Sequence, residues 1–383
     1  MNEKKPLIYI VIGEESGDQL GAQLVSAIRE KFGKDIEFSG LAGERMQQLG
    51  LPSLFPLQDI AVMGVINIIK QYPFLRRRGL EVVADVVQKK PDLLVIIDSP
   101  EFTHAVAKRV RNQLPNLPVV NYVSPSVWAW RPGRAKRMAR YVDHVLALLP
   151  FEPRAHKELQ GPDCTYVGHP LIERLDLLRP HDGEKSSIGE PVLLVLPGSR
   201  RSEVTRLMEE FGIVVKMAME THPDLRVILP AVSHLRPLID EALKSWPSQP
   251  EIVEGEDAKF AAFRQAHAAL AASGTVTLEL GLAGVPMVVA YKVDWLTTRL
   301  GFLIKVPSMV LTNLILGRKA IPEFLNDDAN AHQLWNHLAP LLEESETRSR
   351  QIEAFRNLDA IMHLPKGTPS QKAAEITLSY LKS

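Results

Sequence analysis

The sequence predicts an α/β protein of two domains, each with a parallel β-sheet covered by helices. Strand-like and helix-like segments alternate in both halves of the chain, as they do when parallel strands are joined by helical crossovers. The strand-like segments are continuous apolar runs, which is typical of strands buried on both faces. The chain has 383 residues, 45% hydrophobic and 23% charged, and this length and composition favour two globular domains.

The first half begins with an apolar run directly after the N-terminus, and an amphipathic segment follows it. The pattern then recurs. We expect strands at Leu7–Ile12, Leu93–Ile97, Val119–Val123, Val142–Leu148 and Thr165–Val167, and helices at Asp18–Lys31 and Thr103–Gln113.

The second half repeats this alternation. We expect strands at Val192–Leu196, Arg226–Leu229, Glu251–Val253, Ala268–Ala271 and Pro286–Ala290, and helices at Ser202–Glu220, Leu235–Lys244 and Val276–Leu282. The domain boundary should lie within Gly168–Pro191, where the stretch Asp182–Ser187 is polar and has no strand pattern. The tail, Ala331–Lys382, has helical patterns only.

Composition excludes several classes of protein. The chain has 45 basic and 45 acidic residues, so its net charge does not favour nucleic acid as a partner. Its single cysteine, Cys164, excludes an internal disulfide and a Cys-rich metal site, which fits a reducing compartment. The N-terminal apolar stretch is too short for a signal peptide, and no run of 18 apolar residues predicts a spanning helix. We therefore expect a cytoplasmic protein without a zinc site.

The most informative loop follows the expected strand Ala268–Ala271. The apolar run ends abruptly at Ser273-Gly274-Thr275, and a helical pattern follows. Small residues let backbone N–H groups approach a phosphate, and the positive end of the helix favours the anion. Glu279 lies about one turn after Thr275 on the same face, where a carboxylate could hold the hydroxyls of a ribose. An ordinary N-capped helix with a solvated Glu279 explains the same residues.

A second candidate for phosphate binding follows the strand Val192–Leu196. The segment Gly198-Ser199-Arg200-Arg201 is a Gly-Ser turn with two arginines, which suits a diphosphate. The alternative is that one arginine pairs with Glu203. A phosphate cradle together with a ribose clamp in the second half predicts a nucleotide-sugar donor.

In the first half, two loops carry acids at strand ends. The first strand runs into Gly13–Asp18, which lacks the Gly-x-Gly-x-x-Gly pattern of nicotinamide dinucleotide sites. Asp98 directly follows a buried strand, where a partly desolvated acid suits general-base use. Helix capping is the alternative for Ser16, Asp18 and Asp98.

A loop with two tryptophans follows the strand Val119–Val123. Trp128 and Trp130 flank one alanine, and five basic residues follow from Arg131 to Arg140 with no acid between them. This pattern could bind single-stranded nucleic acid by stacking and charge, or an acidic lipid headgroup. Core tryptophans beside a solvated basic helix are the alternative.

The apolar segment Ile60–Ile69 is a candidate membrane contact. Lys70 and three arginines follow it, and apolar residues with adjoining basic ones bind anionic surfaces. A core helix at the domain edge is the alternative. The residues concerned are Val62, Met63, Val65, Ile66, Ile69, Arg76, Arg77 and Arg78.

Six segments, in order over nearly the whole chain, resemble the lipid-A-disaccharide synthase family. The block at Tyr122–Arg131 is the most specific, and the Gly-rich pieces are weak alone. The segments are Gly13–Gly21 (GEESGDQLG), Ala61–Gly64 (AVMG), Ile97–Phe102 (IDSPEF), Tyr122–Arg131 (YVSPSVWAWR), Leu196–Val204 (LPGSRRSEV) and Ala272–Glu279 (ASGTVTLE).

The resemblance implies a GT-B glycosyltransferase. An acceptor domain at 1–172 and a UDP-donor domain at 186–345 would face a cleft, with helices at 346–383 packing back on the first domain. Such an enzyme joins UDP-2,3-diacylglucosamine to 2,3-diacylglucosamine 1-phosphate (lipid X). The reaction inverts the anomeric carbon and gives the β-1,6-linked disaccharide 1-phosphate and UDP.

The resemblance further implies a peripheral enzyme on the inner face of the Gram-negative inner membrane. It implies no metal or other cofactor and no nucleic-acid partner, and it is compatible with a homodimer. The rival activities are a UDP-sugar epimerase, a glycosyltransferase with a soluble acceptor and, outside catalysis, a nucleic-acid-binding module.

In this chemistry Asp98 suits the base that takes the acceptor's proton, with Glu15 or Asp18 next in line. Arg200 or Arg201, with backbone N–H groups near Ser273–Thr275, suits the diphosphate, and Glu279 suits the ribose. Trp128, Trp130 and Arg131 suit the acceptor or the membrane.

Two departures from the family pattern concern these loops. Glu15 replaces a small residue that the family often has there, and this adds a charge near the acceptor loop. Thr312 replaces a proline beside Asn313, and this changes a loop whose backbone, like Ser273–Glu279, is expected to contribute to UDP binding.

Overall fold

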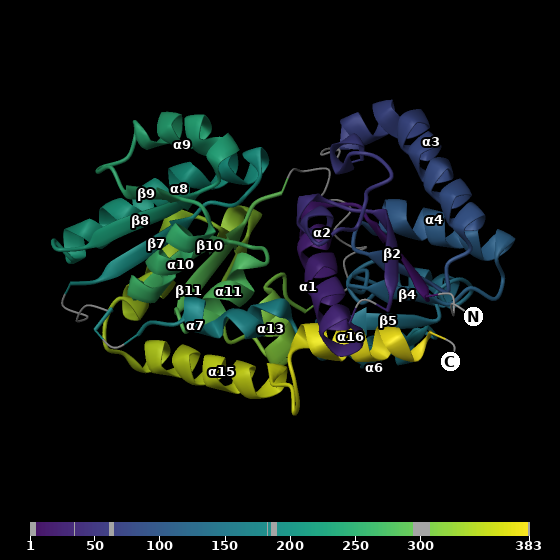
Figure 1. The fold of residues 1–383 in the computed structure, drawn as a ribbon. Coiled ribbons are helices and arrows are strands. Elements are labelled where there is room, and N and C mark those ends of the chain that lie inside the picture. The colour runs from purple at the N-terminus through teal and green to yellow at the C-terminus, as the bar shows by residue number, and fades with distance from the viewer. Residues whose placement is uncertain are drawn as a thin grey trace. The chain divides into compact units, whose positions relative to one another are not determined.

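The computed structural model describes residues 5–33, 35–60, 65–181, 183–184, 190–293 and 307–381, and for 65–70 it describes the backbone alone. The chain divides into two compact units (Figure 1). The first comprises Met1–Pro170 and Leu364–Ser383, and the second comprises Leu171–His363. Each unit has one six-stranded sheet in its described part, and the paired strands are parallel. The predicted α/β architecture of two parallel-sheet domains is confirmed.

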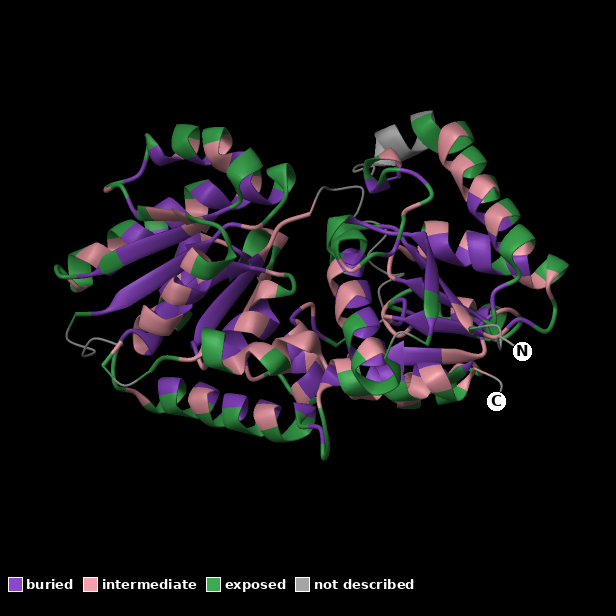
Figure 2. Cartoon of the chain, viewed as in Figure 1, coloured by how far each residue is buried: buried purple, intermediate pink, exposed green. Residues whose placement is uncertain are grey.

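The first sheet has the strand order β2-β1-β3-β4-β5-β6. Its strands are β1 (Leu7–Ile12), β2 (Glu37–Leu41), β3 (Leu93–Ile97), β4 (Val119–Tyr122), β5 (His144–Ala147) and β6 (Asp163–Tyr166). The helices of this unit are α1 (Glu15–Phe32), α2 (Glu44–Gln48), α3 (Val65–Lys89), α4 (Pro100–Gln113), α5 (Gly133–Met138), α6 (Glu152–Glu158) and α16 (Pro369–Ser379). The apolar strands β1 and β3 are buried at nearly every position, which explains their continuous hydrophobic runs. Figure 2 shows buried residues, in purple, along most of the strands of both units.

The second sheet has the order β12-β11-β10-β7-β8-β9. Its strands are β7 (Val192–Leu196), β8 (Arg226–Ala231), β9 (Glu251–Glu254), β10 (Ala268–Ala272), β11 (Met287–Tyr291) and β12 (Glu323–Leu325). The helices of this unit are α7 (Leu175–Leu178), α8 (Arg201–Thr221), α9 (Arg236–Leu243), α10 (Glu256–Gln265), α11 (Val276–Ala283), α13 (Leu311–Leu316), α14 (Ala331–Leu338) and α15 (Glu346–Met362). Small residues dominate β10, which reads AALAA and is fully buried.

Two strands, β2 and β12, are not predicted by the sequence pattern. Strand β12 has only three residues, and β2 contains Ser39 and Gly40, which weaken a strand pattern. Gly40 has φ +148°, and a Cβ there would lie 1.9 Å from the carbonyl oxygen of Ile10. Only glycine therefore allows β2 to approach β1 so closely.

The C-terminal tail is divided between the units. Helix α16 packs against α1 in the first unit (Figure 1). Helix α15 stays in the second unit, where it buries Phe355 and Leu358 and contacts α11 and α13. The expected return of 346–383 to the first domain therefore describes α16 and not α15, whose apolar face is buried within the second unit.

Each sheet has a topological switch point, where the chain's crossovers leave in opposite directions. In the first sheet it lies between β1 and β3, and in the second between β10 and β7. Ligands of open α/β sheets bind outside the carboxyl ends of the strands at such points. The four loops that follow these strands are Gly13–Glu14, Asp98–Ser99, Pro197–Arg200 and Ser273–Thr275, and the first leads directly into the turn of α1 that contains Ser16.

Candidate functional site

Asp98 and Ser16 meet at the first switch point. The Ser16 hydroxyl donates to Asp98 Oδ2 at 2.8 Å, and the backbone N–H of Ser99 donates to Asp98 Oδ1 at 2.7 Å. Strands β1 and β3 are paired, with Ile12 opposite Ile97, so the two loops emerge side by side. Asp98 is partly exposed, and a carboxylate oxygen with one protein donor can still accept a further hydrogen bond.

The backbone at Asp98 is held in a sparsely populated conformation. Asp98 has φ +55° and Ser99 has φ +43°, both in the left-handed region. The Thr103 hydroxyl donates to the Asp98 carbonyl at 2.7 Å and fixes this turn. Gly13 directly follows β1, and a Cβ at this position would lie 2.2 Å from Ser99 Cβ. Only glycine therefore fits where the loop after β1 passes Ser99. Strain of this kind is often found at functional sites.

Asp18 has a structural role, as the helix-capping alternative proposes, although the helix concerned is α2. It is buried, and its two carboxylate oxygens accept from the backbone N–H groups of Gly43, Arg45 and Met46 at 3.0, 2.8 and 3.2 Å. These are the unpaired donors at the start of α2, so Asp18 caps that helix. Glu15 is exposed in the first turn of α1.

A cavity of about 910 Å³ opens beside these residues, within the first unit. It is lined by the first turn of α1, by α2 and by the segment 53–58. Glu15 and Ser16 both line it, and Ser16 is the residue that hydrogen-bonds Asp98. Ser16 thus connects a wall of the cavity to Asp98, which is not itself a lining residue.

The loop after β4 is held by buried polar side chains. Asn121, fully buried, donates from Nδ2 to the Val123 carbonyl at 3.1 Å. Val123 has φ +77°, a strained value for a β-branched residue. The Ser124 hydroxyl lies 2.8 Å from Nε2 of the buried His156, and burial lowers the pKa of His156 to about 4.

Trp128 is held in place by a hydrogen bond to a buried glutamate, Glu152. Its Nε1 donates to Glu152 Oε1 at 3.1 Å, and Glu152 Oε2 accepts from the Leu149 N–H at 3.0 Å. Glu152 is buried, and burial raises its pKa to about 7 against the lowering effect of these hydrogen bonds. Trp128 is thus a scaffold residue of the loop.

Trp130 and Arg131 are exposed at the tip of this loop. The Arg131 guanidinium lies 4.2 Å from the Trp130 ring centroid, and it also approaches Glu101 Oε1 at 3.4 Å. Glu101 pairs with Arg134 as well. The basic stretch has no acid in sequence, but α4 supplies one in space, which reduces its suitability for nucleic acid.

The candidate membrane segment is only partly described. Val62 and Met63 lie outside the described residues, and Val65, Ile66 and Ile69 belong to α3 with undescribed side chains. Arg78 is 22% exposed and pairs with Asp59 and Glu81, so its charge is neutralised, unlike our expectation. Arg77 lies 3.5 Å from Glu81, and Arg76 is exposed. In the described part of the chain, no helix is long and apolar enough to cross a bilayer.

At the second switch point, Glu203 organises the Gly198–Arg201 loop. Its Oε2 accepts from the backbone N–H groups of Ser199 and Arg200 at 3.0 and 3.2 Å, and its Oε1 pairs with Arg200 Nη1 at 3.3 Å. Gly198 has φ +109°, and a Cβ there would strike the Glu203 carboxylate. The backbone N–H groups of Ser199 and Arg200 are therefore occupied, and the exposed cations of this turn are the side chains of Arg200 and Arg201.

The Ser273–Thr275 loop is open. Its strand β10 pairs with β7, with Ala271 opposite Leu196, so the loop lies beside the Gly198 turn. Within the described residues, the backbone N–H groups of Gly274 and Thr275 have no protein acceptor, and a Cβ at Gly274 would meet open space. These two donors at the start of α11 suit an anion.

Glu279 lies in α11 and is not solvated. Its Oε2 pairs with Lys259 Nζ at 2.8 Å, and its side chain is 15% exposed. Lys259, on α10, was not singled out by the sequence because no local pattern connects it to Glu279. The ion pair fixes the carboxylate near the loop, and within the described residues Oε1 of Glu279 has no hydrogen-bond partner.

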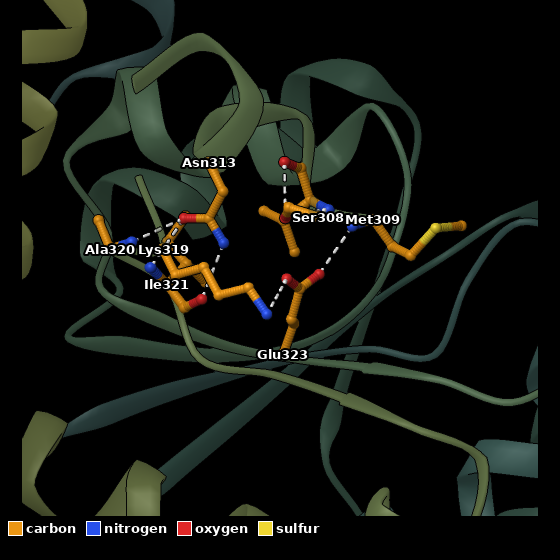
Figure 3. Close-up of polar contacts among 8 residues, drawn as sticks. Ser308, Met309, Asn313, Lys319, Ala320, Ile321 and Glu323 are labelled. Atoms are coloured by element: carbon orange, nitrogen blue, oxygen red, sulfur yellow. Dashed lines mark hydrogen bonds and ion pairs between the residues drawn. The ribbon is translucent and has the colours of Figure 1, made fainter. Parts of the chain in front are cut away.

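Asn313 has a structural role (Figure 3). Its Oδ1 accepts from the N–H groups of Ala320 and Ile321 at 2.9 Å each, and its Nδ2 donates to the Ile321 carbonyl at 2.9 Å. Its side chain is buried and these contacts occupy it, so any effect on UDP must pass through the loop it shapes.

Glu323 holds the adjoining segment (Figure 3). Its Oε2 accepts from the Met309 N–H at 2.8 Å. The Met309 carbonyl in turn accepts from the Ser273 hydroxyl at 2.7 Å. This chain of contacts positions Ser273. Neither Glu323 nor Met309 could be singled out from the sequence, since they lie far from Ser273 along it. The described residues contain no group of three or more His, Cys, Asp or Glu arranged for a metal.

The chain is similar to one family over nearly its whole length. A family model described as lipid-A-disaccharide synthetase matches residues 8–375. The chain is 49% identical over 377 residues to the lipid-A-disaccharide synthase of Nitrobacter hamburgensis, covering 97% of this chain and 94% of the relative. It is 47% identical over 383 residues to that of Bradyrhizobium diazoefficiens, covering 99% and 98%.

Solved structures are similar in fold. The glycotransferase of kitacinnamycin matches with a TM-score of 0.63 and 16% identity over 99% of this chain and 100% of that one. A putative UDP-N-acetylglucosamine 2-epimerase from Listeria monocytogenes matches with a TM-score of 0.62 and 16% identity over 98% and 95%. At such identities these proteins show the fold alone, which is GT-B.

Proposed function

This chain belongs to the lipid-A-disaccharide synthase family, and we propose that its two switch points divide that family's reaction between them. The chain is a UDP-sugar-dependent glycosyltransferase of lipid A disaccharide synthesis, with a nucleotide-sugar donor and a sugar-phosphate acceptor. The epimerase, soluble-acceptor and nucleic-acid alternatives are not favoured, because the family match spans residues 8–375.

In our proposal the first unit binds the acylated acceptor, lipid X, and activates its 6-hydroxyl. The Asp98 carboxylate accepts that hydroxyl's proton as the oxygen attacks the anomeric carbon of the donor. Ser16 and the Ser99 N–H hold the carboxylate through one oxygen each. The observation that carries this assignment is the Ser16–Asp98 hydrogen bond at the wall of the cavity. Glu15, exposed at the same wall, is the next candidate.

The second unit binds the donor, UDP-2,3-diacylglucosamine, in this proposal. The N–H groups of Gly274 and Thr275 and the side chains of Arg200 and Arg201 meet the diphosphate and stabilise the departing UDP. Glu279, fixed by Lys259, accepts from the ribose hydroxyls. These groups supply the charge without a metal ion, and activity should persist in a chelator.

Both substrates carry acyl chains, so we propose that the enzyme works on the cytoplasmic face of the inner membrane. On α3, Tyr72, Arg76 and Leu80 recur every four residues and so share one helix face. Tyr72 is 60% and Leu80 44% exposed, and Arg76 is exposed between them. Replacing Tyr72 and Leu80 with serine should lower liposome binding while cooperative melting persists. Unchanged liposome binding of the folded variant would contradict this surface.

One assay tests the reaction itself. Purified protein is incubated with UDP-2,3-diacylglucosamine and lipid X in mixed micelles, and the lipid product is analysed by mass spectrometry. We expect the disaccharide 1-phosphate and equimolar UDP, with and without chelator. Free UDP without a disaccharide, or an epimerised donor, would refute the proposal.

A further inference from the structure

We propose that Arg45 binds the phosphate of the acceptor inside the cavity beside Ser16. The proposal deepens the proposed function, because it rests on the acceptor being bound by the first unit. It adds a residue that selects phosphorylated acceptors, a property that the base Asp98 cannot supply.

The position of Arg45 follows from two hydrogen bonds. Ser16 donates to Asp98 at 2.8 Å, and Asp18, two residues further along α1, accepts from the Arg45 N–H at 2.8 Å. Asp18 therefore fixes the Arg45 backbone beside the helix turn that contacts the base. In glucosamine 1-phosphate, the reacting hydroxyl is on the exocyclic carbon C6 and the phosphate is on C1, so the two groups lie apart on one sugar. A sugar with its 6-hydroxyl at Asp98, next to Ser16 at the cavity wall, would extend its phosphate toward the other residues that line the cavity.

The charges of the cavity point to Arg45. Among the described residues that line the cavity, Arg45 is the one cation. The same lining includes three acids, Glu15, Asp18 and Glu44. Arg45 is exposed, and no carboxylate in the described part pairs with its guanidinium. An arginine without a partner is suited to a phosphate, which it binds through two parallel hydrogen bonds.

The cavity also has an apolar edge. Leu54 is 38% exposed, and Leu54 and Pro56 line the cavity on the segment that leads toward α3. A polar wall at α1 and α2 opposite exposed apolar side chains suits a sugar phosphate with acyl chains. The donor carries acyl chains as well, so this apolar edge suits an acylated sugar of either kind, and the assignment of the cavity to the acceptor rests on Asp98 being the base.

The test compares two acceptors, lipid X and the same 2,3-diacylglucosamine without its phosphate. In Arg45→Gln we expect kcat/KM for lipid X to fall about 10-fold or more, as for a lost hydrogen bond between charged groups. The value for the acceptor without phosphate should change little. Arg45→Lys should keep part of the preference, and Lys31→Gln, which removes an exposed cation at the end of α1, should keep all of it.

A binding measurement covers the case in which the acceptor without phosphate is too slow to follow. Calorimetry with glucosamine 1-phosphate and with glucosamine should show a preference for the phosphorylated head group that Arg45→Gln removes. UDP affinity should be the same in both proteins.

Three results would overturn the proposal. Equal losses for both acceptors would show that Arg45 serves the fold of α2. Weaker UDP binding would move Arg45 to the donor's diphosphate. An unchanged acceptor preference in Arg45→Gln would show that Arg45 does not bind the acceptor's phosphate. The proposed function is tested separately, because it would still stand if Asp98→Asn abolished disaccharide formation in the same assay.

Discussion

The two switch points of this protein have the same topology and opposite chemistry. At β1 and β3, the loops present the Asp98 carboxylate, which is an acceptor of hydrogen bonds. At β7 and β10, the loops present the N–H groups of Gly274 and Thr275 beside two exposed arginines, which are donors. The first arrangement suits removal of a proton, and the second suits stabilisation of an anion.

In this protein one strand pattern serves two substrates. In both sheets, buried apolar strands position the loops. The residue types in those loops then determine the chemistry. At the first point the backbone is strained, with φ +55° at Asp98, while at the second the special conformation belongs to a glycine, Gly198. A carboxylate needs a fixed position to act on one proton, whereas a diphosphate contacts several donors.

The largest effect should come from Asp98→Asn. The amide keeps the shape of the side chain but cannot take a proton, so turnover should fall by about 100-fold or more. Initial rates with both acylated sugars measure it, and a cooperative melt near that of the wild type controls for folding. Near-normal turnover would move the base to Glu15.

A smaller effect should come from the arginines of the second point. Arg200 is held by Glu203 at the start of α8, yet its side chain is 75% exposed, so its guanidinium is both placed and accessible. We expect Arg200→Ala to weaken UDP binding about 10-fold, and Arg201→Ala to weaken it less. Calorimetry with UDP compares the two. The reverse order would assign the diphosphate to Arg201.

The loop of Trp130 offers a finer test. Asn121→Ala removes the buried hydrogen bond to the Val123 carbonyl and should raise the acceptor KM several-fold, at a cost in stability of about 1–3 kcal/mol. Glycine adopts the φ of Val123 without strain, so the cost should shrink when Val123→Gly is added. Chemical denaturation of the four proteins of this cycle measures the coupling. Additive costs would show that Asn121 does not hold Val123.

The smallest effect concerns pH. Burial raises the pKa of Glu152 from 4.5 to about 7. Between these two pH values the Glu152 carboxyl is therefore protonated in the folded protein and ionised in the unfolded chain. Stability from this group is therefore lost as the pH rises from about 4.5 to about 7. Between pH 5 and pH 8, the free energy of unfolding should fall more in the wild type than in Glu152→Gln. The control Glu158→Gln, which changes an exposed carboxylate, should show the same pH dependence as the wild type. If the free energy of unfolding fell equally in all three proteins, Glu152 would not be the source of the pH dependence.

The sequence predicted those parts of the fold that depend on local periodicity. Continuous apolar strands such as Leu93–Ile97 and Val192–Leu196 appear at their expected bounds. The edge strands β2 and β12 do not follow from the pattern, because one is interrupted by Gly40 and the other has three residues. The assignment of α15 to the second unit depends on contacts between residues far apart in sequence.

At the candidate site, the sequence identified loops better than it identified roles. It selected Asp98 and Ser273–Thr275 because each directly follows a buried strand. It could not show that Asp18 caps α2 or that Asn313 closes its own turn, since those partners are backbone groups brought near by folding. For the same reason Lys259, Glu203 as an acceptor of backbone N–H groups, and Arg45 emerge only from the structure.

The central claim is that each switch point holds its own substrate, and titration of UDP into two variants tests it most directly. Asp98→Asn should bind UDP with wild-type affinity, because Asp98 belongs to the acceptor. Glu279→Ala should bind UDP about 10-fold more weakly, because its carboxylate meets the ribose. If Asp98→Asn weakened UDP binding as strongly, or if Glu279→Ala bound UDP normally, the division of substrates between the two switch points would be wrong.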